Sequence, residues 1–416
     1  MIKTLSVYND RNMAKIFLYG FICGIGLLLS GNTINFWLAS NNINTKIIGF
    51  FSCVAFPYAL KYFIAIFIDR YSFSCFKIKI NSKKNWLILS QIMLVLVLLL
   101  TSFLHPKQHL LLIALSGFFT ALFTTITDII LNSNRIQILN SDELPAGTAI
   151  YTIGYRIGML ISGAGVIYLS SFLSWSLIYL MLGLIYFIFL IIILYIFVEK
   201  SYKKDDSKID KNFWHTIFIS PFEHLKLKYF IWAISFIIIY RVADNMLVIM
   251  LNPFFISLGF TSTEIASISK FFGTIMVIIG GIISGPIITK INIRNSIIYF
   301  GILHMLGYIL YILLNYTGKN IPLLYFITIY ESLTGGMVMT AYITFMSQLC
   351  QGKYVATQYS LLSSGIGLSR VLFPIFSGVI VDYYQWKIFF LTIIIISISA
   401  IILTILMPKQ LYKNIT

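Results

Sequence analysis

Eight ionisable side chains interrupt the long apolar stretches of this 416-residue sequence. Placing such a side chain in a lipid bilayer costs roughly 3 kcal/mol on insertion scales, so eight uncompensated ones would cost on the order of 24 kcal/mol. That cost exceeds the about 5–15 kcal/mol net stability of an ordinary domain. These residues must therefore pair with one another or face a water-filled cavity. They are Lys61, Asp128, Arg156, Arg241, Asp244, Lys270, Glu331 and Arg370.

Cations outnumber acids among these residues by five to three, so pairing every acid leaves two cations over. An excess of buried positive charge suits a solute with carboxylates or phosphates, because Lys and Arg form charge-assisted hydrogen bonds with both groups. We therefore predict that the cations contact a small anionic substrate. The candidate substrate-binding residues are Lys61, Arg156, Arg241, Lys270 and Arg370.

Structural roles compete with this prediction. Arg241 and Asp244 are three residues apart on one helix face, so they could neutralise each other. Arg156 and Arg370 occupy equivalent positions in two halves of the chain and could brace those halves. Lys61 occupies the second predicted span and its counterpart, Lys270, the eighth, and for both we favour contact with a cavity.

The three carboxylates in these stretches are Asp128, Asp244 and Glu331. A carboxyl group in a low-dielectric site prefers its neutral form, whereas a nearby cation restores the charged form. A protein that alternates between two conformations could move a carboxyl group between these environments and so couple solute movement to protons. We predict that the three residues are proton-coupling groups, with a fixed salt bridge as the alternative for each.

No residue spacing in the sequence indicates a metal centre, a cofactor or a catalytic constellation. The sequence lacks a phosphate-binding loop, zinc-ligand spacing and a nucleophile elbow. Its four cysteines lack CxxC spacing and are expected to be small buried residues. His304 is the single histidine of its apolar stretch and is expected to be a hydrogen-bonded interior residue. We predict no enzymatic activity, no metal and no cofactor.

Composition places these residues in a membrane protein. Hydrophobic residues make up 59% of the chain, charged residues make up 11%, and the mean hydropathy is +0.90. A soluble chain would need more polar residues to cover its surface, so lipid must be its main solvent. Twelve apolar runs are too long for strands and lack period-2 alternation, so each predicts a membrane-spanning helix. They lie near 14–38, 46–68, 86–104, 110–131, 147–171, 175–198, 229–258, 264–289, 295–314, 322–348, 355–380 and 386–406.

The net charge of +16 does not indicate nucleic-acid binding, because the basic residues lie between apolar runs rather than on one face. Beside the predicted spans, 21 Lys and Arg residues fall on the side that holds both termini and 4 fall on the other side. Cytoplasmic loops of membrane proteins carry an excess of Lys and Arg. The pattern therefore predicts that both termini are cytoplasmic, which requires an even number of spans.

Two similar halves are indicated by matching segments at equivalent places. The first span leads into Asn35-Phe-Trp-Leu, and the seventh leads into Asn252-Pro-Phe-Phe. Such matches in the same orientation predict two parallel six-helix repeats, the arrangement of major-facilitator transporters, with a substrate site between them near mid-membrane. We predict an N-terminal half at 1–198, a charged cytoplasmic linker at 199–228, and a C-terminal half at 229–416. The fold class is an all-α, twelve-helix membrane protein.

Asp69-Arg70 closes the second predicted span on the cytoplasmic side. This pair resembles the core of the loop between helices 2 and 3 of major-facilitator transporters, although the surrounding glycine and second basic pair are altered. We interpret it as a conformational latch rather than as a binding site.

Further blocks resemble AmpG-type muropeptide permeases of the same superfamily. Residues 154–163 read Gly-Tyr-Arg-Ile-Gly-Met-Leu-Ile-Ser-Gly, and residues 356–363 read Ala-Thr-Gln-Tyr-Ser-Leu-Leu-Ser. The resemblance also includes the segments around Lys61, Asp128, Asp244, Lys270 and Glu331, so it covers nearly the whole chain. It implies proton-driven import of anhydro-muropeptides, which are sugar-peptide fragments of peptidoglycan turnover, across the bacterial inner membrane for cell-wall recycling. Their carboxylates agree with a cationic cavity.

Several positions depart from this family. Its span 4 typically carries a second acid four residues after the first, followed by an aromatic and a basic residue, but here the positions read Asn132, Asn134 and Arg135. Arg241 replaces a usual Lys, and Ser332 replaces a common Asn. A related carrier for another anionic metabolite, such as a nucleotide-like or coenzyme A-like compound, is the main alternative. A membrane sensor or scaffold and a membrane-embedded enzyme are weaker ones, because no signalling domain or catalytic constellation accompanies the spans.

Overall fold

The structure is a computed structural model that describes residues 11–41, 43, 51–70, 82–140, 142–196, 227–351, 354–373, 375–408 and 410–413. Throughout these residues the only regular elements are helices. Most of the predicted linker at 199–228 lies outside them, except for Leu227 and Lys228, which open a helix.

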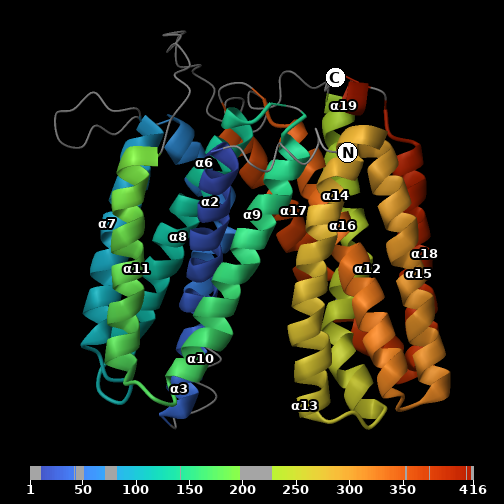
Figure 1. The fold of residues 1–416 in the computed structure, drawn as a ribbon, viewed down its shortest axis with the longest axis horizontal. Coiled ribbons are helices and arrows are strands. Elements are labelled where there is room, and N and C mark those ends of the chain that lie inside the picture. The colour runs from blue at the N-terminus through green and yellow to red at the C-terminus, as the bar shows by residue number, and fades with distance from the viewer. Residues whose placement is uncertain are drawn as a thin grey trace.

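Helices of the first half of the chain form one bundle (Figure 1). Its α-helices are separated in places by short π-helical or 3-10 segments, as in the predicted first and second spans. The elements are α2 (Arg11–Leu28), η2 (Leu29–Thr33), α3 (Ile34–Ser40), η3 (Phe51–Ala55), α5 (Phe56–Ala59), α6 (Lys61–Arg70), α7 (Ser82–Ser102), α8 (Leu110–Ile138), α9 (Leu144–Leu160), η4 (Ile161–Gly165), α10 (Val166–Leu169) and α11 (Trp175–Ile196).

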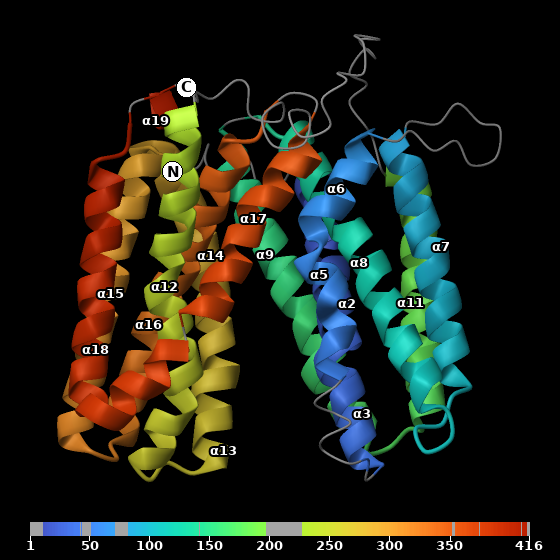
Figure 2. The same ribbon diagram turned by 180° about the vertical axis from the view of Figure 1, so that it is seen from behind.

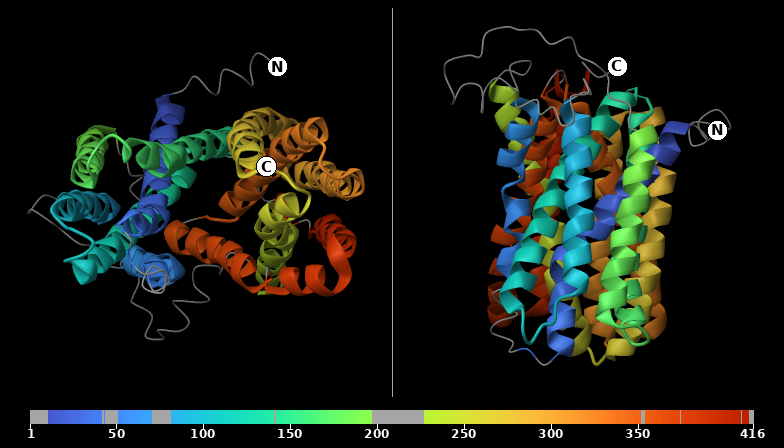
Figure 3. Two further views of the ribbon diagram at one scale, coloured as in Figure 1. Left: turned by 90° about the horizontal axis from the view of Figure 1, so that it is seen from below. Right: turned by 90° about the vertical axis from the view of Figure 1, so that its left-hand side faces the viewer.

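Helices of the second half form the neighbouring bundle, and Figure 2 shows the pair from behind. Viewed along the helix axes, the bundles lie side by side (Figure 3). The elements are α12 (Leu227–Ser257), α13 (Ser262–Ile265), η7 (Ala266–Phe272), α14 (Gly273–Ile291), α15 (Ile293–Thr317), α16 (Ile321–Gln348), α17 (Val355–Leu372), α18 (Ile375–Ile405) and α19 (Gln410–Lys413).

Ten helices in the described residues are long and apolar enough to cross a membrane. The two other predicted spans, 46–68 and 355–380, are interrupted helices instead. The first breaks into η3, α5 and α6, with a turn at Leu60 that separates α5 from α6. In the predicted span 355–380, α17 ends at Leu372 and α18 begins at Ile375. Within α18, Gln385 has a φ of 65° and separates this span from the last predicted span. Together these elements agree with the twelve predicted spans.

Glycines allow helices to pack closely within each bundle. In the first bundle a Cβ atom added to Gly158 of α9 would lie 2.1 Å from the Phe21 carbonyl oxygen of α2, so only a glycine fits this contact. In the second, a Cβ atom on Gly336 of α16 would lie 2.2 Å from the Val277 carbonyl oxygen of α14. Small residues serve this purpose in membrane helices, where close van der Waals packing drives association.

The two bundles meet at the end where α2 begins and α19 lies, and they diverge toward the opposite end (Figures 1 and 2). Between the bundles, α9 packs against α14, and α17 packs against both α6 and α8. Ala356 of α17 joins the apolar core of the first bundle, and Ile136 of α8 joins the core of the second. Side-chain packing therefore joins the bundles at one end.

Large apolar side chains cover the outer surface. Leu100, Phe103, Leu111 and Tyr195 are each more than 60% exposed, as are many similar residues on both bundles. Such a surface is compatible with lipid and not with water.

Candidate functional site

An ion pair joins two helices of the first bundle. The Lys61 ammonium group at the start of α6 lies 2.5 Å from Oδ2 of Asp128 in α8. Tyr151 of α9 donates a hydrogen bond to Oδ1 of Asp128 at 3.0 Å, and the Asn132 amide donates to the same oxygen at 2.8 Å. The Asn132 amide also lies 2.9 Å from the Tyr151 hydroxyl, so these four side chains form one closed network.

Arg135 extends this network to the other bundle. Its guanidinium donates to Thr148 at 2.7 Å and, across the contact between bundles, to Ser347 of α16 at 3.0 Å. The rings of Tyr151 and Tyr359 face the same guanidinium at 5.1 and 5.7 Å. No carboxylate pairs with it among the described residues, although the side chain is fully buried. Neutral acceptors and aromatic faces thus hold this cation.

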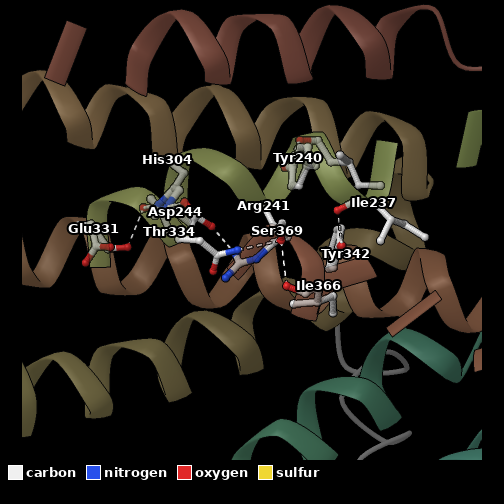
Figure 4. Close-up of polar contacts among 12 residues, drawn as sticks. Ile237, Tyr240, Arg241, Asp244, His304, Glu331, Thr334, Tyr342, Ile366 and Ser369 are labelled. Carbon is white, nitrogen blue, oxygen red and sulfur yellow. Dashed lines mark hydrogen bonds and ion pairs between the residues drawn. The ribbon is translucent and has the colours of Figure 1, made fainter. Parts of the chain in front are cut away.

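Asp244 of α12 is the centre of the polar network in the second bundle (Figure 4). One carboxylate oxygen accepts from Arg241, one turn earlier on the same helix. The other accepts from the Tyr308 hydroxyl and lies 2.9 Å from Nε2 of His304, both of which belong to α15. One carboxylate therefore serves three partners on two helices.

His304 links Asp244 to α16. Its Nδ1 atom lies 2.9 Å from the hydroxyl oxygen of Thr334, which is also 2.8 Å from the Tyr330 carbonyl oxygen. A small cavity of about 20 Å³ lies beside the imidazole, between α12, α15, α16 and α18. Glu331 lies one turn from Thr334 and interacts electrostatically with His304, but it forms no ion pair within the described residues.

Three arginines converge on the region between the bundles. Arg156 comes from α9 in the first bundle, whereas Arg241 and Arg370 come from α12 and α17 in the second. Both repel Arg156 electrostatically. Neither Arg156 nor Arg370 forms an ion pair in the part of the chain that the structure describes. Arg156 is half-buried and Arg370 is exposed, so two guanidinium groups are available to an anion.

A polar contact joins the bundles at the end where they meet. The Asp69 carboxylate of α6 accepts hydrogen bonds at 2.8 Å from both the backbone N–H and the hydroxyl of Thr357 in the first turn of α17. The Lys83 ammonium group lies 3.0 Å from its other oxygen. The geometry fits a latch; the side chain of Arg70, the second residue of the predicted pair, lies outside the described part.

The structure thus brings most of the predicted residues into two networks and one cluster. The Lys61–Asp128 and Arg241–Asp244 pairs agree with the ion-pairing alternative in the sequence prediction. The side chain of Lys270, in η7, lies outside the described part. Sequence reasoning gave Arg135 no role in the site, because the fourth predicted apolar run ends at 131, before the polar Asn-Ser-Asn segment that precedes this arginine. His304 is a hydrogen-bonded interior residue, as predicted.

Together these groups can bind an anion and exchange a proton. The arginines provide planar donors suited to carboxylates, and the two bundles contribute them jointly. Movement of one bundle against the other would therefore change the cluster's affinity for an anion.

Sequence comparisons place the chain among transporters. A family model described as Major Facilitator Superfamily matches residues 16–359 and 316–414. The protein named AmpG 1 in Rickettsia bellii is 39% identical over 97% of this chain and 100% of its own length. The protein of that name in Rickettsia conorii is 39% identical over 97% of this chain and 99% of its own. The Rickettsia prowazekii counterpart is 36% identical, over 95% and 98% respectively.

Solved structures show the same fold at much lower identity. The human organic anion transporter MFSD10 matches with a TM-score of 0.73 and 11% identity, over 95% of this chain and 99% of its own. The transporter FucP in its outward conformation matches with a TM-score of 0.71 and 12% identity, over 96% and 99% respectively.

Proposed function

Since the chain belongs to the Major Facilitator Superfamily and, within it, to the AmpG-type transporters, we propose that it imports anhydro-muropeptides with protons. Import would run from the periplasm to the cytoplasm across the bacterial inner membrane and would serve peptidoglycan recycling. In this proposal both termini are cytoplasmic, and the bundles contact each other on the cytoplasmic side. The diverging end then faces the periplasm, from which the substrate enters.

The observation that carries the proposal is the arginine cluster contributed by both bundles. Arg156 and Arg370 have no ion-pair partner within the described residues, and Arg241 repels Arg156. Bringing like charges together is unfavourable unless an anion neutralises them. A peptide carboxylate between these groups would relieve the repulsion and hold the two bundles together. Substrate binding would then favour the movement that carries the substrate across.

Proton coupling requires a carboxyl group whose environment changes during that movement. Asp128 and Asp244 each lie in an ion pair, and Glu331 lies close to His304 without one. We propose that protonation within this set accompanies import. The test variants are Asp128→Asn, Asp244→Asn and Glu331→Gln. Uptake should lose its dependence on the proton gradient only in the variant that lacks the coupling residue. Normal gradient-driven accumulation in all three variants would refute the assignment.

The test is uptake of labelled anhydro-muropeptide into proteoliposomes, with and without an inward proton gradient. We expect accumulation that needs the gradient and that a protonophore abolishes. Protein inserted in random orientation must be sorted by a one-sided protease or label, so that import is read from correctly oriented molecules. Absence of uptake by folded protein would overturn the muropeptide assignment.

A second candidate substrate is another anionic metabolite, such as a nucleotide-like or coenzyme A-like compound. The observation that favours it is Asn132, which replaces the family's second span-4 acid and leaves Arg135 without a carboxylate partner among the described residues. Competition with unlabelled compounds separates the two. If such a compound displaces bound label or is itself accumulated while muropeptides are not, the second candidate holds.

A further inference from the structure

His304 is a titratable group buried in the second bundle, and the anion-binding cluster does not explain its presence. Its side chain is only 7% exposed, yet both ring nitrogens have polar partners. The partners come from two other helices: Asp244 from α12 and Thr334 from α16. Figure 4 shows the imidazole between these two side chains.

The partners allow the imidazole to hold either one proton or two. An ionised carboxylate only accepts hydrogen bonds, so Nε2 must donate to Asp244. A threonine hydroxyl can both donate and accept. When Nδ1 carries no proton, the Thr334 hydroxyl donates to it. When Nδ1 is protonated, the hydroxyl accepts from it and turns its own hydrogen to the Tyr330 carbonyl oxygen, 2.8 Å away.

Asp244 connects this change to the arginine cluster. Its Oδ2 atom contacts Arg241, whereas its Oδ1 atom contacts both His304 and Tyr308. A proton added to His304 places a second full positive charge against a single carboxylate. The attraction between Asp244 and Arg241 then weakens, because the new cation competes for the carboxylate and repels the guanidinium.

We propose that His304 is the proton-sensing residue of this transporter, and that its protonation releases Arg241 from Asp244 to bind the anionic substrate. The inference rests on the proposed proton-coupled transport, but it places the proton on His304 rather than on the three carboxylates, with Asp244 remaining ionised as its partner. The proton comes from the external solution, adds to Nδ1, and leaves to the cytoplasmic solution after the anion has dissociated. Linkage then requires that a bound anion strengthen proton binding to the same extent.

Other charged or titratable groups surround the imidazole. Asp244, Arg241 and Tyr240 face it from α12, Tyr308 lies one turn away on α15, and Glu331 acts from α16. From α18, the residues that line the adjacent cavity are Ser397, Ala400 and Ile401, none of which titrates. The cavity has room for about one water molecule beside the ring.

The first experiment follows the imidazole itself and needs no substrate. Protein with ¹⁵N-labelled histidine is titrated in lipid nanodiscs between about pH 5 and 8, the range in which histidines change charge. The His304→Gln variant assigns the signal, and His105→Gln, in the loop before α8, is the matched control. We expect Nδ1 to gain a proton within this range, and Asp244→Asn to lower the midpoint by about one unit or more.

A His304 signal that does not change across this range would overturn the inference, as would an unchanged midpoint in folded Asp244→Asn protein. If that variant does not fold, Thr334→Val provides the second test. Valine has the shape of threonine but cannot exchange a hydrogen with Nδ1, so the midpoint must move. An unchanged midpoint in Thr334→Val contradicts the assigned contact.

The second experiment measures the affinity for labelled anhydro-muropeptide as a function of pH. In wild-type protein, affinity should rise about tenfold for each unit that the pH falls through the His304 transition, if one proton binds with one anion. In His304→Gln this dependence should vanish while binding persists. A pH dependence retained in His304→Gln would refute the inference even if transport itself is confirmed. Absence of binding in wild-type protein would refute the substrate assignment. The titration of His304 would then decide the inference about the imidazole by itself.

Discussion

Asp69, in the last turn of α6, accepts two hydrogen bonds of 2.8 Å from Thr357, in the first turn of α17. The carboxylate belongs to one bundle and the helix N-terminus to the other. The first backbone N–H groups of a helix have no intrahelical partners and carry a partial positive charge, so a carboxylate binds them well. This contact stabilises the conformation in which the two bundles meet at the end that contains α19.

Asp69→Asn should shift the protein toward the conformation in which this end is open. The variant keeps an acceptor but loses the charge, so we expect a loss of about 1–2 kcal/mol, or roughly 5- to 30-fold in population. Distances between spin labels at Lys84 and Lys290, on the two bundles at this end, measure the shift. Asp142→Asn, an exposed residue at the same end, is the matched control. An unchanged distance distribution in Asp69→Asn would show that the contact is not a latch.

Arg156→Gln should reduce transport without reducing stability. Arg156 forms no ion pair within the described residues and is repelled by Arg241 and Arg370, so removing its charge relieves repulsion. The unfolding temperature should stay equal or rise, while KM for the substrate rises roughly 10- to 150-fold, the equivalent of a lost charged hydrogen bond of about 1.5–3 kcal/mol. Arg156→Lys keeps the positive charge but lacks the planar guanidinium group. Its KM should lie between those of the wild type and Arg156→Gln. A lower unfolding temperature with unchanged KM would assign Arg156 a bracing role instead.

Lys61→Met should destabilise the protein far more than the double variant Lys61→Met/Asp128→Asn. The single change leaves a carboxylate without its cation in a site where each side chain is less than 20% exposed, at a cost of about 3–5 kcal/mol. Removing both charges avoids that cost. Thermal unfolding of the two variants and of Asp128→Asn completes a double-mutant cycle. Equal unfolding temperatures for Lys61→Met and the double variant would mean that the two charges are not coupled. Retained uptake in a folded double variant would exclude both residues from substrate and proton binding.

Glu264, in the short helix α13, should make stability depend on acid pH. The backbone N–H of Thr261 and, to a lesser extent, the Lys319 side chain hold the pKa of its carboxyl below the ordinary value. A lowered folded-state pKa stabilises the fold fully above the unfolded-state value of about 4.3, and this stabilisation is lost as the pH falls through the folded-state pKa. Glu264→Gln should flatten this part of the pH profile of thermal unfolding. Lys319→Met should flatten it less, because the backbone contact remains; a larger effect in Lys319→Met would reverse the order of the two causes.

The sequence predicted the membrane fold because lipid imposes simple constraints. Every backbone polar group must be satisfied within its own segment, so long apolar runs must be helices, and repeated segments indicate two similar halves. The spans that departed from this rule, 46–68 and 355–380, are broken helices. Hydropathy does not detect such breaks, because they depend on local turns such as the one at Leu60.

Within the site, the sequence determined which residues carry charge and which pairs share one helix. The spacing of Arg241 and Asp244 was enough to predict their contact, because residues three apart lie on the same face. Only the tertiary structure decided which charges from distant segments meet. His304 and Asp244 are 60 residues apart, and Arg135 and Ser347 are 212 apart. Those contacts depend on how helices rotate and pack within and between the bundles. That packing is set by glycine contacts and apolar side chains in three dimensions, and no local pattern in the sequence encodes it.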